Sequence, residues 1–303
     1  MKHLLNTLIS EKFNIAISNF KIKQKSPESY SLPAAEINFS HVLELIQNNP
    51  VLLFLDFDGT LTPIVNDANK PQLSSEMKSV LQKLSEMPHV KVAIITGRSI
   101  KDIKSRVKIK NLIYSGNHGL EIKGDNLNFK YPIQSSYKQN LKYIYSSLNQ
   151  KLNSINGVLI QNKNLTLSLH YRMVEKKDTA FVKKIFYETV KKADKRFIKI
   201  LKGKKVLDIR PNIFWSKGDA VQYLINNYKS DPAFIKAVPV FFGDDITDEF
   251  VFKRLQKNGI TVRIGKSKIS QAKFYLNSPE ELHQFLLVLQ DLQKNKIPKK
   301  IKD

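Results

Sequence analysis

The chain has 303 residues, of which 42% are hydrophobic and none is cysteine; this predicts a globular protein of about two domains, without disulfides or thiolate metal sites, in a reducing compartment such as the cytoplasm. No apolar run approaches the roughly 18 residues of a membrane span, and the polar residues near the N-terminus argue against a signal peptide. Fifty Lys and Arg against 27 Asp and Glu give a net charge of +23, but no recognition motif concentrates it, so we favour a basic surface that attracts a small anionic substrate over a nucleic-acid or anionic-membrane binder.

Residues 1–40 are weakly periodic and are interpreted as an N-terminal extension, followed by a short helix over 39–47. Short apolar runs then predict buried strands at 51–55, 90–95, 111–115, 205–209, 238–242 and 260–264. Helix-period stretches lie between several of them, at 73–87, 99–106, 217–228, 247–257 and 279–293. Apolar strands separated by helices indicate a parallel sheet buried on both faces, and therefore an α/β domain.

The middle of the chain has a different pattern. It holds two long helical stretches, 135–152 and 178–194, and the alternating run "LTLSLHYR". One face of that run carries Leu165, Leu167, Leu169 and Tyr171, and the other carries Thr166, Ser168, His170 and Arg172. The run is typical of a half-buried antiparallel strand. We therefore expect an α+β domain at 119–204, inserted between two parts of the sheet domain at 41–118 and 205–303.

Acidic and polar residues follow the predicted strands. In chain order they are Asp56, Asp58, Thr96, Arg98, Asp244, Asp245 and Asp248. Lys217, at the start of a later predicted helix, joins this set. In parallel sheets, sites form beyond the carboxyl ends of the strands. Several carboxylates with open positions for water and phosphate suit Mg²⁺, which would offset the repulsion between the acids. The pattern predicts a magnesium-dependent phosphoryl-transfer site.

Asp56 and Asp58 are two residues apart, so on an extended segment they point the same way. One can then act as a nucleophile that forms an aspartyl-phosphate, and the other as a general acid and then base. Thr96 and Lys217 would donate hydrogen bonds and charge to the transferring group. Single motifs also have plain structural interpretations, since "SIKD" and "SKGD" match helix capping boxes. Four such motifs at strand ends favour catalysis.

The segments "DFDGT", "ITGR", a lysine before a helix and "GDDITDE" resemble the four motifs of the haloacid dehalogenase superfamily of phosphohydrolases. With "GNHGLEI", "LSLHYR" and "LDIRP…SKGDA", the chain resembles the trehalose-6-phosphate phosphatase family over about residues 50 to 290. The resemblance implies a Rossmann-like hydrolase core with an inserted cap domain that selects the substrate, bound Mg²⁺, and hydrolysis of trehalose 6-phosphate in trehalose biosynthesis.

The resemblance also implies roles for individual residues. Asp56 would be the nucleophile and a metal ligand, Asp58 the acid/base and a ligand through its backbone carbonyl, and Asp244 the third ligand. The supporting acids would be Asp245 and Asp248, and the phosphate pocket would hold Thr96, Arg98 and Lys217. The positions that match sugar-binding residues are Asn117, His118, Glu121, Lys163, His170, Arg172, Asp208 and Arg210.

Two positions depart from the family pattern, because Gln161 and Asp208 stand where glutamates are usual. Both lie in the expected sugar shell, so another sugar or polyol phosphate is the alternative substrate. A hypothesis of another class is a basic nucleic-acid or anionic-surface binder whose acids are structural. A partnership with a trehalose-6-phosphate synthase would involve a separate chain.

Overall fold

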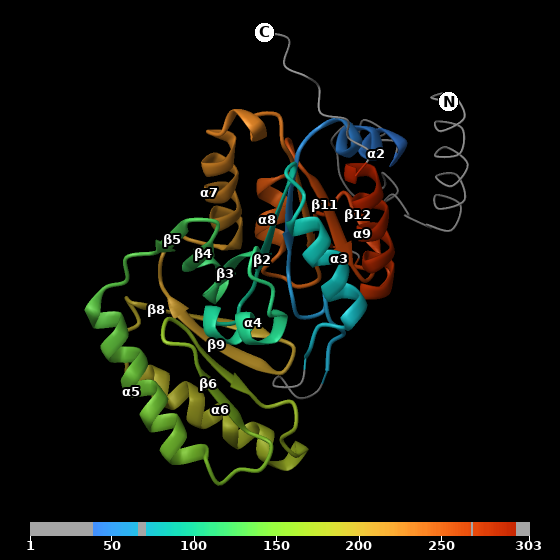
Figure 1. Ribbon diagram of the computed structural model, residues 1–303. Coiled ribbons are helices and arrows are strands. Elements are labelled where there is room, and N and C mark those ends of the chain that lie inside the picture. Colours follow the sequence, from blue (N-terminus) through green and yellow to red (C-terminus); the bar gives the residue numbers. More distant parts are fainter. Residues whose placement is uncertain (1–38, 66–70, 268, 295–303) are drawn as a thin grey trace, which may run out of the picture.

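The computed structural model describes residues 39–65, 71–267 and 269–294, which form two β-sheets with their helices (Figure 1). The predicted extension at 1–40 lies outside the described residues except for its last two positions. No helix of the described ranges is long and apolar enough to cross a membrane.

The larger sheet has eight strands in the order β12-β11-β10-β1-β2-β3-β4-β5. Its six parallel strands are β1 (Val51–Leu55), β2 (Val90–Ile95), β3 (Ile113–Gly116), β10 (Val238–Gly243), β11 (Ile260–Ile264) and β12 (Phe274–Leu276). The hairpin of β4 (Glu121–Gly124) and β5 (Leu127–Lys130) extends one edge antiparallel. We call this sheet with its helices the core.

Helices cover both faces of the larger sheet. One face carries α2 (Phe39–Asn48), α3 (Ser75–Ser85), α4 (Ile100–Val107) and α9 (Pro279–Lys294), and the other carries α7 (Lys217–Lys229) and α8 (Glu249–Arg254). Short 3-10 turns lie at Asn117–Gly119 and Pro232–Phe234. Along β1, Leu53 packs into the first layer while Leu52 and Phe54 pack into the second, as the period of two in a strand requires.

The smaller sheet is antiparallel, with the strand order β6-β7-β9-β8. Its strands are β6 (Leu159–Asn162), β7 (Leu167–His170), β8 (Ile198–Gly203) and β9 (Val206–Pro211). Helices α5 (Ser135–Leu152) and α6 (Lys176–Lys191) cover one face, where Leu167 and Leu169 are fully buried against them. The other face carries the polar residues of β7. We call this sheet with its two helices the cap.

Two predicted segment assignments are wrong. Residues 205–209 were expected in the parallel sheet, but β9 pairs with β7 and β8 in the cap. The alternation of β9, with Leu207 and Ile209 buried and Asp208 and Arg210 on the opposite face, is the reason it forms an antiparallel strand with one polar side. Residues 121–130 were expected in the inserted domain, but they form β4 and β5 of the larger sheet. The division into core and cap as functional units stays a prediction.

The other predicted elements of the core are confirmed. The strands at 51–55, 90–95 and 260–264 have the expected bounds, as does helix 135–152. The capping interpretation is also confirmed, since Ser99 accepts a hydrogen bond from the backbone of Asp102 and Ser216 forms a capping box with Asp219. Capping and chemistry therefore coexist, because α4 follows β2 directly and the first residue of α7, Lys217, donates to Asp56.

Candidate active site

A cavity of about 320 Å³ lies between the carboxyl ends of β1, β2 and β10 and the polar face of the cap. From the core it is lined by Asp56, Asp58, Thr96, Arg98, His118, Lys217, Asp244 and Asp245, and from the cap by Gln161, Lys163, Ser168, His170, Arg172, Asp208 and Arg210. Most of the predicted site residues, although they are scattered along the sequence from Asp56 to Asp245, therefore lie around one space.

The floor of the cavity holds three buried carboxylates. Asp56, Asp244 and Asp248 each place a carboxylate oxygen within 4.8 Å of the other two. The Lys217 ammonium donates to Asp56 at 2.6 Å and to Asp248 at 2.8 Å. The carboxylate of Asp244 packs against Gly59, which has a φ of 87°, so a side chain at this position would displace Asp244. This close approach explains the glycine that follows the second acid.

The charges of this cluster are not balanced. Burial raises the pKa of Asp56, against the opposing effect of Lys217. Burial, followed by the charges of Asp248 and Asp245, raises the pKa of Asp244 to about 7. One carboxylate oxygen of Asp244 is buried and makes no hydrogen bond to the described residues. An unpaired oxygen among excess negative charge fits a divalent cation.

Asp248 has a supporting position. One of its oxygens accepts the hydrogen bond from Lys217, and the other accepts from the backbone N–H groups of Asp244 and Asp245, each at 3.0 Å. The side chain therefore holds the loop after β10. It does not line the cavity itself, and its supporting role for a metal stays a prediction.

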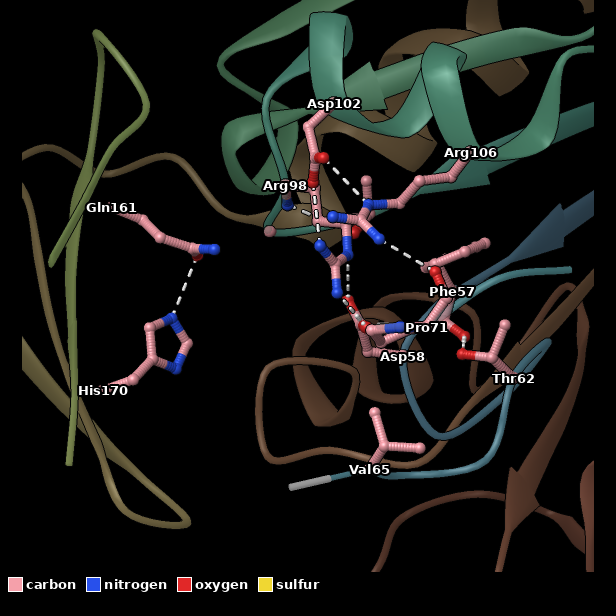
Figure 2. Close-up of polar contacts among 12 residues, drawn as sticks. Phe57, Asp58, Thr62, Val65, Pro71, Arg98, Asp102, Arg106, Gln161 and His170 are labelled. Atoms are coloured by element: carbon pink, nitrogen blue, oxygen red, sulfur yellow. Dashed lines mark hydrogen bonds and ion pairs between the residues drawn. The ribbon is translucent and has the colours of Figure 1, made fainter. Parts of the chain in front are cut away.

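Arg98 and Asp58 form a bidentate pair at the side of the cavity (Figure 2). Arg98 donates from Nε and Nη2 to the two oxygens of Asp58, at 2.7 and 2.6 Å. Its Nη1 donates to Asp102 at 2.8 Å. Burial would lower the pKa of Arg98, but the hydrogen bonds that Arg98 donates to Asp58 and Asp102 raise its pKa above the ordinary value. Arg98 was expected to serve the phosphate pocket, whereas here its guanidinium orients the second acid.

In Figure 2, two side chains of the cap lie across from Arg98 and Asp58. His170 and Gln161 are joined through Nε2 and Oε1 at 3.0 Å. Burial, followed by the charge of Lys163, lowers the pKa of His170 to about 4. The imidazole is therefore neutral at physiological pH, and the pair offers uncharged hydrogen-bonding groups to a ligand.

The rest of the cap wall is charged. Asp208 accepts hydrogen bonds from Ser168 and from Arg210. Although burial raises the pKa of Asp208, the charges of Lys163 and Arg210 hold it below its ordinary value. Lys163 reaches across to the core and donates to the carbonyl of Gly97 at 3.0 Å. These groups supply directional donors and acceptors of the kind that sugar hydroxyls need.

Some predicted sugar-binding residues have other positions. Asn117 and Glu121 do not line the cavity. Asn117 donates to Glu121 at 2.7 Å and to the carbonyl of Lys163 at 3.2 Å, and accepts from Thr166 at 2.7 Å. This geometry does not support direct sugar contacts by Asn117 and Glu121. They join the core loop after β3 to the cap instead.

His118 and Arg172 do line the cavity. His118 has a φ of 58° and its imidazole packs against Gly97. Burial lowers its pKa well below the ordinary value, so it too is neutral. Arg172 donates to the backbone carbonyls of Val65 and Lys204, each at 2.9 Å. It therefore ties a core loop to the β8–β9 hairpin of the cap.

Sequence reasoning missed several residues at the site. The hairpin lysines Lys202, Lys204 and Lys205 line the cavity, as do the apolar side chains Ile64, Val65, Ile246 and Phe250. No motif marks the three lysines, because the two-residue turn between β8 and β9 places them by geometry. Asp102 is part of the predicted capping segment "SIKD". Its spacing of four residues from both Arg98 and Arg106 is the sequence signal that indicates ion pairs.

The parallel α/β sheet with an interposed cap, and with paired acids and a threonine at its strand ends, is the fold of haloacid dehalogenase-like hydrolases. A haloacid dehalogenase-like hydrolase from Bacteroides thetaiotaomicron shares the fold, with a TM-score of 0.54 and 13% identity, covering 78% of this chain and 98% of that one.

The family can be stated more narrowly. The model of the trehalose-phosphatase family matches residues 54–280, and the chain belongs to this family. Trehalose-phosphate phosphatase B of Arabidopsis thaliana is 31% identical over 268 residues, which cover 84% of this chain and 70% of that protein. The C-terminal domain of a Candida albicans trehalose-6-phosphate phosphatase has a TM-score of 0.70 and 26% identity, covering 84% of this chain and 98% of that one. The predicted family and fold class are confirmed.

Proposed function

We propose that the protein is a Mg²⁺-dependent phosphatase that hydrolyses trehalose 6-phosphate to trehalose and phosphate through a phosphorylated Asp56. The observation that carries this proposal is the buried cluster of Asp56, Asp244 and Asp248 with Lys217, at the floor of a cavity whose opposite wall is built for hydrogen bonding. The names of the relatives support the substrate.

The residues that would hold Mg²⁺ are Asp56 and Asp244 through their side chains and Asp58 through its backbone carbonyl, with Asp245 and Asp248 in support. The bound ion would neutralise the carboxylates and the charge on the phosphoryl oxygens. The engagement of Asp248 by Lys217 and by two backbone N–H groups favours its supporting role over direct ligation.

In the first step, a carboxylate oxygen of Asp56 forms a bond to phosphorus while the bond from phosphorus to the sugar oxygen breaks. Asp58 gives its proton to the departing sugar oxygen. Lys217, at 2.6 Å from Asp56, opposes the effect of burial on the pKa of the nucleophile and stabilises charge on the phosphoryl group. Thr96, which is buried directly after β2, would donate a hydrogen bond to the same group.

In the second step, Asp58 takes a proton from water, and the water oxygen bonds to phosphorus as the bond to Asp56 breaks. The proton returns Asp58 to its starting form and phosphate leaves. The cap wall excludes bulk water and holds the sugar. Gln161, Lys163, His170, Asp208 and Arg210 supply its polar groups.

The test is phosphate release from trehalose 6-phosphate, glucose 6-phosphate and sucrose 6-phosphate with Mg²⁺. We expect the highest kcat/KM with trehalose 6-phosphate. Turnover without this preference would support a phosphatase activity but refute trehalose 6-phosphate as the preferred substrate. No turnover of any sugar phosphate would remove both.

The second candidate is a phosphatase of the same mechanism for another sugar or polyol phosphate. The observation that favours it is the uncharged Gln161 paired with a neutral His170, where the family pattern has a carboxylate. A higher kcat/KM with another sugar phosphate of the panel than with trehalose 6-phosphate would establish it.

A further inference from the structure

A chain of ion pairs leads from the cavity into the core (Figure 2). It begins at Asp58, continues through Arg98 and Asp102 to Arg106, and ends at the backbone carbonyl of Pro71. The donor–acceptor distances along it are 2.6 and 2.7 Å for Asp58–Arg98, 2.8 Å for Arg98–Asp102, 2.8 Å for Arg106–Asp102 and 2.9 Å for Arg106 to Pro71.

Asp102 is the central member of this chain. Its Oδ2 accepts from Arg98 and its Oδ1 accepts from Arg106, so each oxygen serves one guanidinium. Asp102 does not line the cavity, but Asp58 and Pro71, at the two ends of the chain, both do. The residue therefore connects the second acid to a wall of the same cavity.

The geometry at Arg98 is restrictive. Nε and Nη2 hold Asp58 while Nη1 holds Asp102, and the guanidinium lies over the Phe57 ring at 5.5 Å. Only 8% of the Arg98 side chain is exposed. Because a guanidinium is planar, two carboxylates bound on different edges fix its rotation. The orientation of Asp58 therefore depends on Asp102.

A plainer interpretation treats these contacts as helix surface pairs. Asp102 is four residues from both arginines and lies in the first turn of α4, where an acid stabilises a helix by a few tenths of a kcal/mol. That interpretation accounts for Asp102 with Arg106. It does not account for the continuation to Asp58, which lies 40 residues away in the sequence on another strand end.

We propose that Asp102 is a positioning residue for the phosphatase reaction, which orients the carboxylate of Asp58 toward the departing sugar oxygen by fixing the plane of Arg98. This inference rests on the proposed acid/base role of Asp58. Without the charge of Asp102, Arg98 and Arg106 lose their shared anion and Arg98 can rotate. The described contacts of Asp102 do not reach the cluster of Asp56, Lys217 and Asp244, so the nucleophile stays intact.

The test uses Asp102→Asn in the full chain and two substrates. One is the sugar phosphate that the panel prefers, whose leaving oxygen needs a proton. The other is p-nitrophenyl phosphate, whose nitrophenolate leaves as a stable anion. We expect kcat/KM to fall roughly tenfold with the sugar phosphate and about twofold or less with the aryl phosphate, because only the first needs an aligned acid.

Two further variants control the comparison. Asp102→Glu retains the charge and should recover most of the lost kcat/KM. Glu76→Gln removes an acid from the first turn of α3, away from the cavity, and should leave both substrates unchanged. If Asp102→Asn does not fold, as judged by circular dichroism, Arg106→Gln takes its place with a loss of roughly threefold on the sugar phosphate alone.

An equal loss on both substrates, or no loss on either, overturns the positioning role. If the wild type does not hydrolyse the aryl phosphate, the recovery with Asp102→Glu decides, and no recovery overturns the proposal. Asp58→Asn separates the two levels of inference. Normal turnover by that variant refutes the proposed mechanism, whereas an inactive Asp58→Asn beside a normal Asp102→Asn refutes only the role of Asp102.

Discussion

The two walls of the cavity hold their polar groups by different means. On the core side, Asp56, Asp248 and Lys217 are nearly inaccessible and interlocked by hydrogen bonds of 2.6 to 2.8 Å. On the cap side, Gln161 and His170 form an uncharged pair at 3.0 Å, and Asp208 accepts from Ser168 and Arg210. The core side is built from compensating charges, whereas the cap side sets the neutral Gln161–His170 pair beside charged donors and acceptors such as Lys163 and Asp208. The difference separates chemistry, which needs fixed charge, from recognition, which needs directional hydrogen bonds.

The largest loss of activity on the core side of the cavity is expected from Asp56→Asn. We expect kcat to fall by at least about 10³-fold, because an amide cannot form the acyl phosphate. Substrate binding should change little, since the cap wall is intact. Steady-state kinetics and calorimetric binding measure the two effects. Turnover within tenfold of the wild type would contradict the role of Asp56.

Removal of the metal tests whether the excess negative charge of the core wall needs a cation. With EDTA we expect loss of turnover, and saturating Mg²⁺ should restore it and raise the free energy of unfolding by about 2–3 kcal/mol. Asp244→Asn should lose most of that Mg²⁺-dependent increment. Chemical denaturation with and without Mg²⁺ measures it. The same increment in wild type and variant would place the ion elsewhere.

Arg172→Ala tests the contact between the core side and the cap side of the cavity. Arg172 holds Val65 of the core and Lys204 of the cap through their carbonyls, so its loss should raise KM by roughly tenfold and change kcat less. Arg196→Ala is the matched control, because Arg196 is an exposed cap arginine away from the cavity. A drop in kcat at unchanged KM would show instead that Arg172 acts on the chemical step.

The neutral state of His170 is tested by pH. Its pKa is about 4 in the folded protein against 6.5 for an ordinary histidine, so the unfolded chain takes up a proton first as the pH falls. Stability is therefore full above pH 6.5 and is lost toward pH 4, by about 1–2 kcal/mol after allowance for partial exposure. His170→Asn should show a correspondingly weaker acid dependence in urea unfolding. Identical slopes for both proteins would refute a neutral His170.

The smallest effect is expected from Gln161→Glu. A carboxylate in this place would favour the charged imidazole and raise the pKa of His170. We expect a change of about threefold in the preference among sugar phosphates, with kcat nearly unchanged. NMR titration of the His170 ring and the substrate panel measure the two effects. A large loss of kcat would show that the cap wall takes part in the chemistry.

The core wall could be predicted from the sequence because its signals are local. A continuous apolar run such as 51–55 ends where the strand leaves the buried layers, and the next polar residue is at the edge of the sheet. Asp56, Thr96 and Asp244 follow such runs, and parallel strands bring their ends together. Strand parity likewise placed His170 and Asp208 on the polar faces of their strands.

The rest depends on contacts between distant segments. The alternation in 205–209 indicates a strand with one polar side, but its partner, β7 in the cap, lies in a distant segment of the sequence. The pairing of Arg98 with Asp58 and the contact of Asn117 with Lys163 join residues 40 and 46 positions apart. The direction of a side chain in a loop after a strand depends on the packed structure. The sequence therefore predicts candidate site residues, but not the residues that they contact.

The account depends most on phosphate transfer to Asp56. Wild-type protein quenched in acid during turnover, digested and analysed by mass spectrometry tests it directly. We expect phosphate on the peptide that contains Asp56, and none in the Asp56→Asn variant. Phosphate on a different residue, or an unmodified Asp56 peptide at a time when turnover is rapid, would contradict the account.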